Sequence, residues 1–346
     1  MRRVLWGFGG IRKSVHALLA VIAALQVGSP IAGVAPSATV VRAVAGHGST
    51  VGSMWSAPEH RVLVGVSTPP GPNDLTALGA FEHAAGRRVA VYSFYQGWAS
   101  GGFDGAAMSA IAARGAIPMV TWEPWDYTKG VDQPAYRLAR IAAGAFDGEI
   151  RGWATAAKRY GGRILLRFAH EMNASGYPWC EGVNGNAAGS YVRAWRHVHD
   201  VFDAVGADNV GWVWAPNVAY AGTTPLRELY PGDRYVDWVA LDGYNGGTAL
   251  PWGGWLPFDR IFGQSIRELR VLAPHKPIMI SEVASAEEGG SKAAWIRGFF
   301  ASLAKEPAVR AFVWFDWNKE TDWRIQSSSA AERAFAAGVA DPRYGT

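Results

Sequence analysis

Residues 163–173 read RILLRFAHEMN, an apolar run that ends in the polar side chains of His170, Glu171 and Asn173. The run is short and follows a pair of glycines, which is typical of a buried strand. We therefore expect a strand over Arg163–His170 that presents polar residues where it ends. Because the same pattern recurs along the chain, it decides the fold.

Seven other short runs of β-branched and aromatic residues complete a set of eight expected strands: Leu63–Pro69, Val89–Tyr95, Ile117–Trp122, Arg163–His170, Val210–Ala215, Val236–Asp242, Pro277–Glu282 and Val309–Phe315. Amphipathic stretches typical of helices lie between them, among them Asp74–Ala85, Asp104–Arg114, Ala188–Val205, Phe258–Leu272 and Lys292–Ala304. Strands that alternate with helices form parallel βαβ units, and near-continuously apolar strands are typical of a sheet covered by helices. Eight units predict an α/β fold, a single (β/α)8 barrel with its active site at the C-terminal ends of the strands.

The composition fits a large globular enzyme-sized domain. Of 346 residues, 49% are hydrophobic and 18% are charged, which provides a large core and excludes intrinsic disorder. The 17 Trp exceed what such a core needs and suggest exposed stacking surfaces. The single cysteine, Cys180, excludes an intramolecular disulfide and a cysteine-based zinc cluster.

Residues 1–45 have the pattern of an export signal. Four basic residues between positions 2 and 13 precede an apolar run over Val15–Val27, and Ala43-Val44-Ala45 offers a cleavage site. An uncleaved membrane anchor over residues 14–35 is the alternative. Either interpretation makes residues 46–346 the barrel domain and places it outside the cytoplasm, secreted or at the cell envelope.

The net charge of +4 is local, because residues 1–45 carry five basic residues and no acid. The remaining chain has a net charge of about −1, which argues against nucleic acid or acidic lipid as a partner. Membrane contact is expected only through an uncleaved N-terminal segment. No motif calls for a metal or an organic cofactor. We expect a monomer, although no sequence feature reports the oligomeric state.

Polar and aromatic residues gather at the ends of seven of the eight expected strands. The clusters are Tyr95-Gln96-Gly97-Trp98, Trp122-Glu123-Pro124-Trp125, His170-Glu171-Met172-Asn173, Trp214-Ala215-Pro216-Asn217, Asp242-Gly243-Tyr244-Asn245, Ser281-Glu282 and Trp314-Phe315-Asp316-Trp317. The C-terminal ends of barrel strands meet at one face, so these clusters predict a functional site there. Glu123 could serve as a third acid, in sugar binding or structurally.

Two carboxylates carry the expected chemistry. Glu171 ends the fourth strand and Glu282 ends the seventh, and in a closed barrel these strands face each other across the mouth. Period-two alternation places Arg167 and Glu171 on the same inward face, where the guanidinium can keep a carboxylate ionised. The same alternation, counted from Ile278 and Ile280, points Glu282 inward. Paired carboxylates among stacking aromatics are what glycoside hydrolysis requires.

These motifs resemble glycoside hydrolase family 26. The resemblance rests on residues 167–173 (RFAHEMN), 177–179 (YPW), 242–245 (DGYN) and 280–282 (ISE), and it extends over most of the barrel. It implies a retaining (β/α)8 glycosidase, a group that includes β-mannanases, mixed-linkage β-glucanases and β-1,3-xylanases. The chain departs from the family where Ala174-Ser175 follow Asn173, a place where the family often has glycine and an aromatic residue.

The resemblance also implies roles for individual residues. Glu171 would be the acid/base and Glu282 the nucleophile, with His170 orienting the acid and the sugar and Tyr244 donating to the nucleophile. Arg167 would help to keep Glu282 anionic. Substrate contacts are expected from the following residues: His170, Arg167, Asn173, Trp122, Trp179, Asp242, Tyr244 and Trp314. The sequence H170-E171 does not continue to a second histidine at position 174, so it is not a zinc-peptidase motif.

The expected function is therefore that of a secreted, retaining endo-β-glycanase acting on a polysaccharide, first of all a mannan endo-1,4-β-mannosidase. β-1,3-1,4-glucan and β-1,3-xylan remain alternative substrates. A non-catalytic carbohydrate-binding barrel is the alternative from another functional class, although such a protein would have no need of both glutamates.

Overall fold

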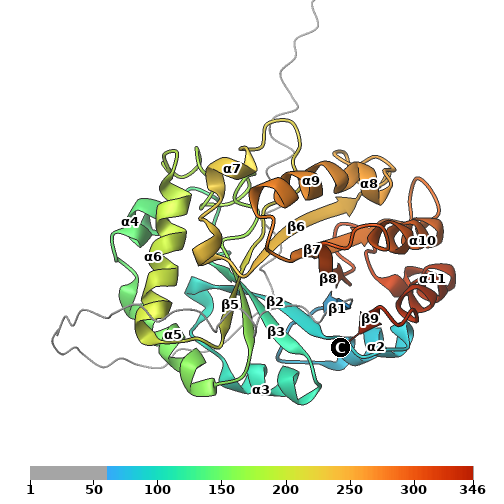
Figure 1. Ribbon diagram of the computed structural model, residues 1–346, viewed down its shortest axis with the longest axis horizontal. Helices are drawn as coiled ribbons and strands as arrows, with labels where there is room; N and C mark the ends of the chain where they lie inside the picture. The colour runs from blue at the N-terminus through green and yellow to red at the C-terminus, as the bar shows by residue number, and fades with distance from the viewer. Residues whose placement is uncertain (1–60, 346) are drawn as a thin grey trace, which may run out of the picture.

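The computed structural model describes residues 61–345 as eight parallel strands surrounded by helices (Figure 1). The strands are β1 (Val62–Ser67), β2 (Val91–Gly97), β3 (Ile117–Glu123), β4 (Ile164–Phe168), β5 (Val210–Trp214), β6 (Trp238–Asn245), β7 (Ile278–Ser285) and β8 (Val309–Phe315). Each strand pairs in parallel with its neighbours in sequence, and β1 pairs with both β8 and β2. The ring is closed, which confirms the predicted (β/α)8 barrel.

Helices fill the connections between strands. They are α2 (Thr76–Ala85), α3 (Gly105–Ala113), α4 (Leu138–Ala142), α5 (Asp147–Tyr160), α6 (Ser190–Val205), α7 (Leu226–Leu229), α8 (Phe258–Ile261), α9 (Gly263–Leu272), α10 (Lys292–Leu303) and α11 (Ser329–Val339). Short 3₁₀ turns are η2 (Trp98–Ser100), η3 (Pro134–Tyr136), η4 (Asp233–Tyr235) and η5 (Ile325–Ser327). A last short strand, β9 (Tyr344–Gly345), pairs with β1 outside the ring.

Local sequence explains why these helices form where they do. In α6 the residues Tyr191, Ala194, Trp195, Val198 and Phe202 are buried, a spacing of three and four that makes one apolar stripe toward the barrel. Helix α3 begins after Asp104, whose carboxylate accepts from the backbone N–H groups of residues 106 and 107. Each helix thus has its own start signal or apolar face.

The core has two layers. The inner layer fills the barrel with alternate residues of the strands, including Leu63, Leu165, Ala240, Met279 and Val313. The outer layer, between strands and helices, is much larger and contains most of the buried aromatic residues. A strand residue therefore faces the barrel interior or the helices according to its parity, and this decides which side chains reach the site.

Strand β7 breaks the regular alternation. Leu241 of β6 pairs with Ile280, but Asp242 pairs with Glu282, so Ser281 is an extra residue in β7. Ile278 and Ile280 pack in the outer layer, which means that the alternation used in the sequence argument would have pointed Glu282 toward the helices. The bulge restores it to the inward face, since a bulge places two residues opposite one and re-aims the side chain that follows.

The expected export signal or anchor in residues 1–45 lies outside the described residues, as does the boundary at residue 46. Within residues 61–345, no helix is both long and apolar enough to cross a membrane.

Candidate active site

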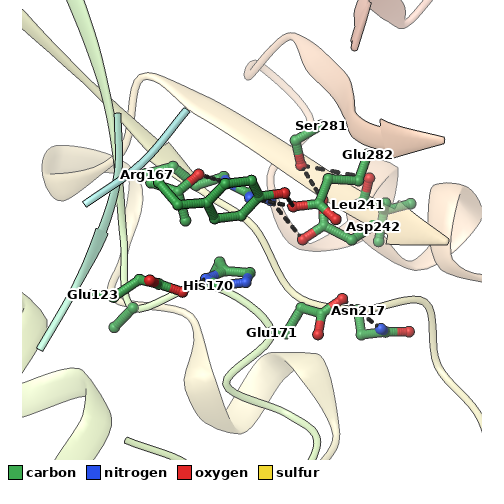
Figure 2. A network of polar contacts seen from close by, with 12 residues as sticks. Glu123, Arg167, His170, Glu171, Asn217, Leu241, Asp242, Ser281 and Glu282 are labelled. Carbon is green, nitrogen blue, oxygen red and sulfur yellow. Dashed lines mark hydrogen bonds and ion pairs between the residues drawn. The ribbon is translucent and has the colours of Figure 1, made fainter. Parts of the chain in front are cut away.

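Arg167 of β4 lies at the centre of a buried polar network at the C-terminal end of the barrel (Figure 2). Its Nε donates to Thr121 Oγ1 at 2.9 Å and its Nη1 to Asp242 Oδ2 at 2.7 Å, while Nη2 donates to Glu282 Oε1. The guanidinium, which is fully buried, therefore joins β3, β4, β6 and β7. Charge-assisted hydrogen bonds of this kind fix the place of their acceptors, although burial still raises the pKa of Asp242 well above its usual value.

Glu282 receives three donors on its two carboxylate oxygens. Besides Arg167, the hydroxyl of Tyr95 donates to Oε1 at 2.6 Å and the hydroxyl of Tyr244 donates to Oε2. These three contacts fix the orientation of the carboxylate. The side chain is 2% exposed, so its few open directions point into the site.

Glu171 is positioned by a turn and not by strand alternation. Strand β4 ends at Phe168, and both Ala169 (φ 44°) and Glu171 (φ 50°) then have left-handed backbone conformations. Such conformations are costly for residues with a Cβ and cluster at functional sites. Asn217 Nδ2 donates to Glu171 Oε1 at 2.8 Å, whereas Oε2 has no hydrogen-bond partner. Burial, and secondarily the charge of Glu282, raises the pKa of Glu171 to about 8.

The two glutamates face each other at short range. Glu171, Asp242 and Glu282 each place one carboxylate oxygen within 4.8 Å of the other two. The surroundings keep Glu171 protonated at neutral pH, while three donors contact the carboxylate of Glu282. Such a pair can donate a proton from one side of a bound group and attack it from the other. As a metal site the three acids fit poorly, because Arg167 already donates to Asp242 and Glu282.

His170 is fully buried beside this pair, and Figure 2 shows it between Glu123 and Glu171. Neither ring nitrogen has a hydrogen-bond partner, and Nδ1 lies 3.9 Å from Glu123 Oε1. Burial and, to a smaller extent, Arg167 lower the pKa of His170 well below its usual value. Burial raises the pKa of Glu123 to about 8. At neutral pH both groups are therefore uncharged, and both His170 ring nitrogens and Glu123 Oε1 are buried without hydrogen-bond partners.

A cleft of about 360 Å³ opens beside the two glutamates. Its walls come from the β5–α7 connection, the long β6–α8 connection, and the segment after β8. Lining residues are Glu171, Asn217, Val218, Ala219, Tyr220, Gly243, Tyr244, Trp252, Gly253, Gly254, Leu256, Arg260, Ile261, Glu282, Phe315, Glu320 and Trp323. Tyr220, Trp252 and Leu256 are 49%, 42% and 43% exposed, so three large apolar side chains stand open at the rim.

The structure brings together most of the residues expected in the site. Glu171, Glu282, Arg167, Asp242 and Tyr244 form one connected group, and His170 adjoins it. Tyr244 donates to Glu282, as the family resemblance implies.

Trp122 and Trp314 were expected to contact substrate, but neither side chain lies in the site. Trp122 packs against Trp98, Trp153 and other rings in the outer layer, and Trp314 packs against Phe335 on the helix side of β8. They are 3% and 0% exposed. Both tryptophans occupy strand positions that face the helices, and the residues that follow them, Glu123 and Phe315, face the barrel mouth. Neither tryptophan can line a sugar subsite.

Asn173 and Trp179 support the site from beneath and do not reach the cleft. Asn173 Nδ2 donates to Asn217 O and its Oδ1 accepts from Asn217 N, both at 2.9 Å, so the side chain holds the backbone of Asn217. Trp179 is buried, stacks on Tyr177 at 4.5 Å and donates to His170 O at 2.6 Å. Substrate contact by either residue stays a prediction.

Tyr95 and Asn217, which donate to the two glutamates, were missed as candidates. Both belong to the polar clusters at strand ends, so the sequence carried a signal for them. Parity would have selected Tyr95, since Val91 lies in the inner core layer and Tyr95 is four residues further along β2. The role of Asn217 depends on the turn after β4, which the sequence pattern does not reveal.

Comparisons with known proteins agree with this geometry. The profile of Glycosyl hydrolase family 26 matches residues 114–297. Endoglucanase H of Acetivibrio thermocellus is 39% identical over 277 residues, 77% of this chain and 30% of that protein. Mannan endo-1,4-beta-mannosidase A and B of Caldalkalibacillus mannanilyticus is 38% identical over 87 residues, 24% of this chain and 16% of that protein. The chain thus spans less than a third of the length of either relative.

Among solved structures, the catalytic domain of the GH26 endo-β-1,4-mannanase from Bacillus sp. JAMB-750 has a TM-score of 0.64 at 17% identity, covering 82% of this chain and 87% of that chain. This likeness shows the shared barrel fold. The family profile covers more than half of the sequence, including the segments that carry Glu171 and Glu282. The chain therefore belongs to glycosyl hydrolase family 26.

Proposed function

We propose that this glycoside hydrolase is a retaining endo-β-glycanase that works by double displacement, with Glu282 as nucleophile and Glu171 as acid/base. The observation that carries the proposal is the pair itself: two carboxyl groups with oxygens within 4.8 Å, one protonated by its surroundings and one held by three donors. Retaining enzymes separate these groups by about 5–5.5 Å and inverting enzymes by roughly 6.5–9.5 Å. The short distance supports retention.

In the first step Glu282 attacks the anomeric carbon while Glu171 gives its proton to the leaving glycosidic oxygen. The covalent glycosyl-enzyme forms as that bond breaks, and Glu171 becomes anionic. In the second step Glu171 takes a proton from water, which attacks the anomeric carbon and releases Glu282. Tyr95, Tyr244 and Arg167 return their hydrogen bonds to the leaving carboxylate. His170 and Glu123, with free polar atoms, are placed to bind sugar hydroxyls.

A polymer is the substrate that the cleft favours. Tyr220, Trp252 and Leu256 are exposed at its rim beside Glu171, where rings can stack on pyranose faces without charge. An open groove of this kind accepts the interior of a chain. Since a polysaccharide is too large to enter a cell, the proposal includes export of the enzyme by residues 1–45.

We propose a β-glucan, in the first place mixed-linkage β-1,3-1,4-glucan, as the polymer. The relative whose similarity extends over 77% of this chain is named an endoglucanase. β-1,4-Mannan, which the sequence resemblance placed first, is the second candidate, favoured by the shorter match to a mannosidase.

Reducing-sugar release from mixed-linkage glucan, β-1,4-mannan, galactomannan and β-1,3-xylan tests the proposal. We expect the highest kcat/KM on mixed-linkage glucan and, with Glu282→Ala, a loss of about 10³-fold or more. The anomer released first, followed by NMR, should be the β form. Fastest turnover of a mannan would transfer the substrate to the second candidate, and initial release of the α anomer would contradict retention. Sugar binding without release by the wild-type protein would support a binding barrel instead.

A further inference from the structure

Lys292 is a buried lysine outside the carboxylate network. It is the first residue of α10, and its Nζ donates to Asp322 O at 2.9 Å, Arg324 O at 2.7 Å and Ser327 Oγ at 2.9 Å. An ammonium group has three donors, so these acceptors satisfy it completely. All three belong to residues 316–328, which join β8 to α11 and are called the β8 segment below.

The position is unfavourable for a cation. Burial lowers the pKa of Lys292 to about 8, against the opposing effect of acids that include Glu287 and Asp322. Helix α10 also starts at this residue, and the N-terminal end of a helix dipole disfavours positive charge. An apolar side chain of similar length would fill the space without this desolvation cost. An apolar residue could not donate the three hydrogen bonds that Lys292 makes, so these bonds are the reason for a lysine at this position.

These hydrogen bonds hold the β8 segment at one particular place. Two of the acceptors are the carbonyls of Asp322 and Arg324, which are the residues on either side of Trp323. Trp323 lines the cleft, and the centre of its ring lies 5.1 Å from that of Tyr244. Tyr244 in turn donates to Glu282. Lys292 is therefore linked, through one tryptophan, to both the wall of the cleft and a donor of the candidate nucleophile.

The β8 segment has further hydrogen bonds at this point, among them those from Trp314 Nε1 to Trp323 O at 3.0 Å, from Trp323 Nε1 to Glu320 Oε2 at 3.1 Å and from Ile325 N to Asp316 Oδ1 at 2.8 Å. Trp323 N donates to Trp317 O at 2.9 Å, and Ser327 Oγ donates to Glu287 Oε1 at 2.7 Å. The bond between Trp323 and Trp317 stays within the segment, whereas the bond from Ser327 to Glu287 joins the segment to the connection between β7 and α10. Loss of the ammonium would leave two carbonyls without these donors.

We propose that Lys292 is a positioning residue that sets the place of Trp323, and through it the cleft wall and the hydroxyl of Tyr244 on Glu282. The kinetic part of this inference rests on the proposed function. Lys292 itself touches no reacting atom.

The test compares Lys292→Met with Lys158→Met in the full chain. Lys158, an exposed lysine, controls for the loss of a lysine that donates to a backbone carbonyl elsewhere, because its Nζ donates to Val205 O at 2.8 Å on the α5–α6 side of the barrel. With mixed-linkage glucan, and well below the melting temperature, we expect Lys292→Met to raise KM about fivefold and lower kcat less. Lys158→Met should leave both constants unchanged.

A double-mutant cycle separates positioning from general stability. If Lys292 acts through Trp323, its effect on KM should largely disappear in a Trp323→Leu background and persist in a Trp252→Ala background across the cleft. Full additivity with Trp323→Leu would overturn the proposal, as would a Lys292→Met enzyme with unaltered kinetics. Should Lys292→Met fail to fold, Ser327→Ala removes one of the three acceptors and must show the same coupling with a smaller effect.

A spectroscopic measurement keeps the inference independent of activity. The indole N–H resonance of Trp323, assigned by its loss in Trp323→Leu, should shift in Lys292→Met, whereas that of Trp195, which donates to Tyr235 O, should not. An unshifted Trp323 resonance would contradict positioning even if the enzyme cut none of the four polymers, while inactivity of the wild type contradicts only the proposed function.

Discussion

Glu171 is held in its protonated form by its surroundings, and this sets the expected pH dependence. Burial and the charge of Glu282 raise its pKa to about 8. An acid catalyst must carry its proton before the first step, so the alkaline limb of kcat/KM should fall as the pH rises through about 8. The pH profile of kcat/KM checks this. A decline that already begins near pH 5 would contradict the assignment of Glu171.

Asn217 provides a finer test of the same group. Its donation to Glu171 Oε1 at 2.8 Å favours the carboxylate, and so works against burial. Asn217→Ala should therefore raise the pKa of Glu171 and move the alkaline limb of kcat/KM to higher pH. At neutral pH we expect a loss of roughly tenfold, because one orienting hydrogen bond is gone. A limb that moves to lower pH would show that another group controls it.

At the residue scale, the position of a residue in the alternation along its strand decides whether its side chain reaches the site. Arg167 was predicted to face inward and does so, because β4 alternates regularly up to Phe168. Trp122 was chosen for its chemistry, yet its neighbours Thr121 and Glu123 occupy the inward positions of β3. Aromatic residues on the outer face serve helix packing, and residue type alone does not distinguish the two faces.

At the scale of elements, two tryptophans should respond in opposite ways. Trp252 stands 42% exposed on the β6–α8 connection, so Trp252→Ala should raise KM roughly fivefold with little change in stability. Trp314 is buried between β8 and the helices, so Trp314→Ala should cost about 3–5 kcal/mol of unfolding free energy, and any rise in KM should be small and come only through Trp323, whose carbonyl accepts from Trp314 Nε1 at 3.0 Å. Urea denaturation of both variants measures the loss of stability, and steady-state kinetics measure the change in KM. The reverse pattern would restore Trp314 to the subsites.

Two local irregularities explain why the sequence located both glutamates but did not explain their orientation. The bulge at Ser281 turns Glu282 inward, and left-handed residues at positions 169 and 171 place Glu171 beyond the end of β4. Neither device has a sequence signature, since Ser281, Ala169 and Glu171 are not the glycine or asparagine residues that usually mark such conformations. Their strain is compensated by contacts from other strands, which only the assembled barrel provides.

At the scale of the whole molecule, the barrel itself was predictable because eight apolar runs alternate with amphipathic segments, and each run forms the expected strand within a few residues. The parallel ring then brings strands distant in sequence to one mouth. The guanidinium of Arg167 from β4 joins these strands, because it donates to Thr121 of β3, Asp242 of β6 and Glu282 of β7. The polar network thus closes across the barrel interior.

This charge should matter for stability as well as for catalysis. Arg167→Met leaves Asp242 and Glu282 buried without their cation, which costs about 3–5 kcal/mol when one partner of a buried pair is removed. Arg167→Met combined with Asp242→Asn should recover part of this loss, because one uncompensated carboxylate is gone and Ser281 Oγ can still donate at position 242. Activity should not recover, since Glu282 still lacks its guanidinium donor. Urea denaturation measures the first effect and reducing-sugar release the second. A single variant within about 1 kcal/mol of wild type would mean that the tyrosine donors and entering water suffice to hold these carboxylates, and that the arginine serves catalysis alone.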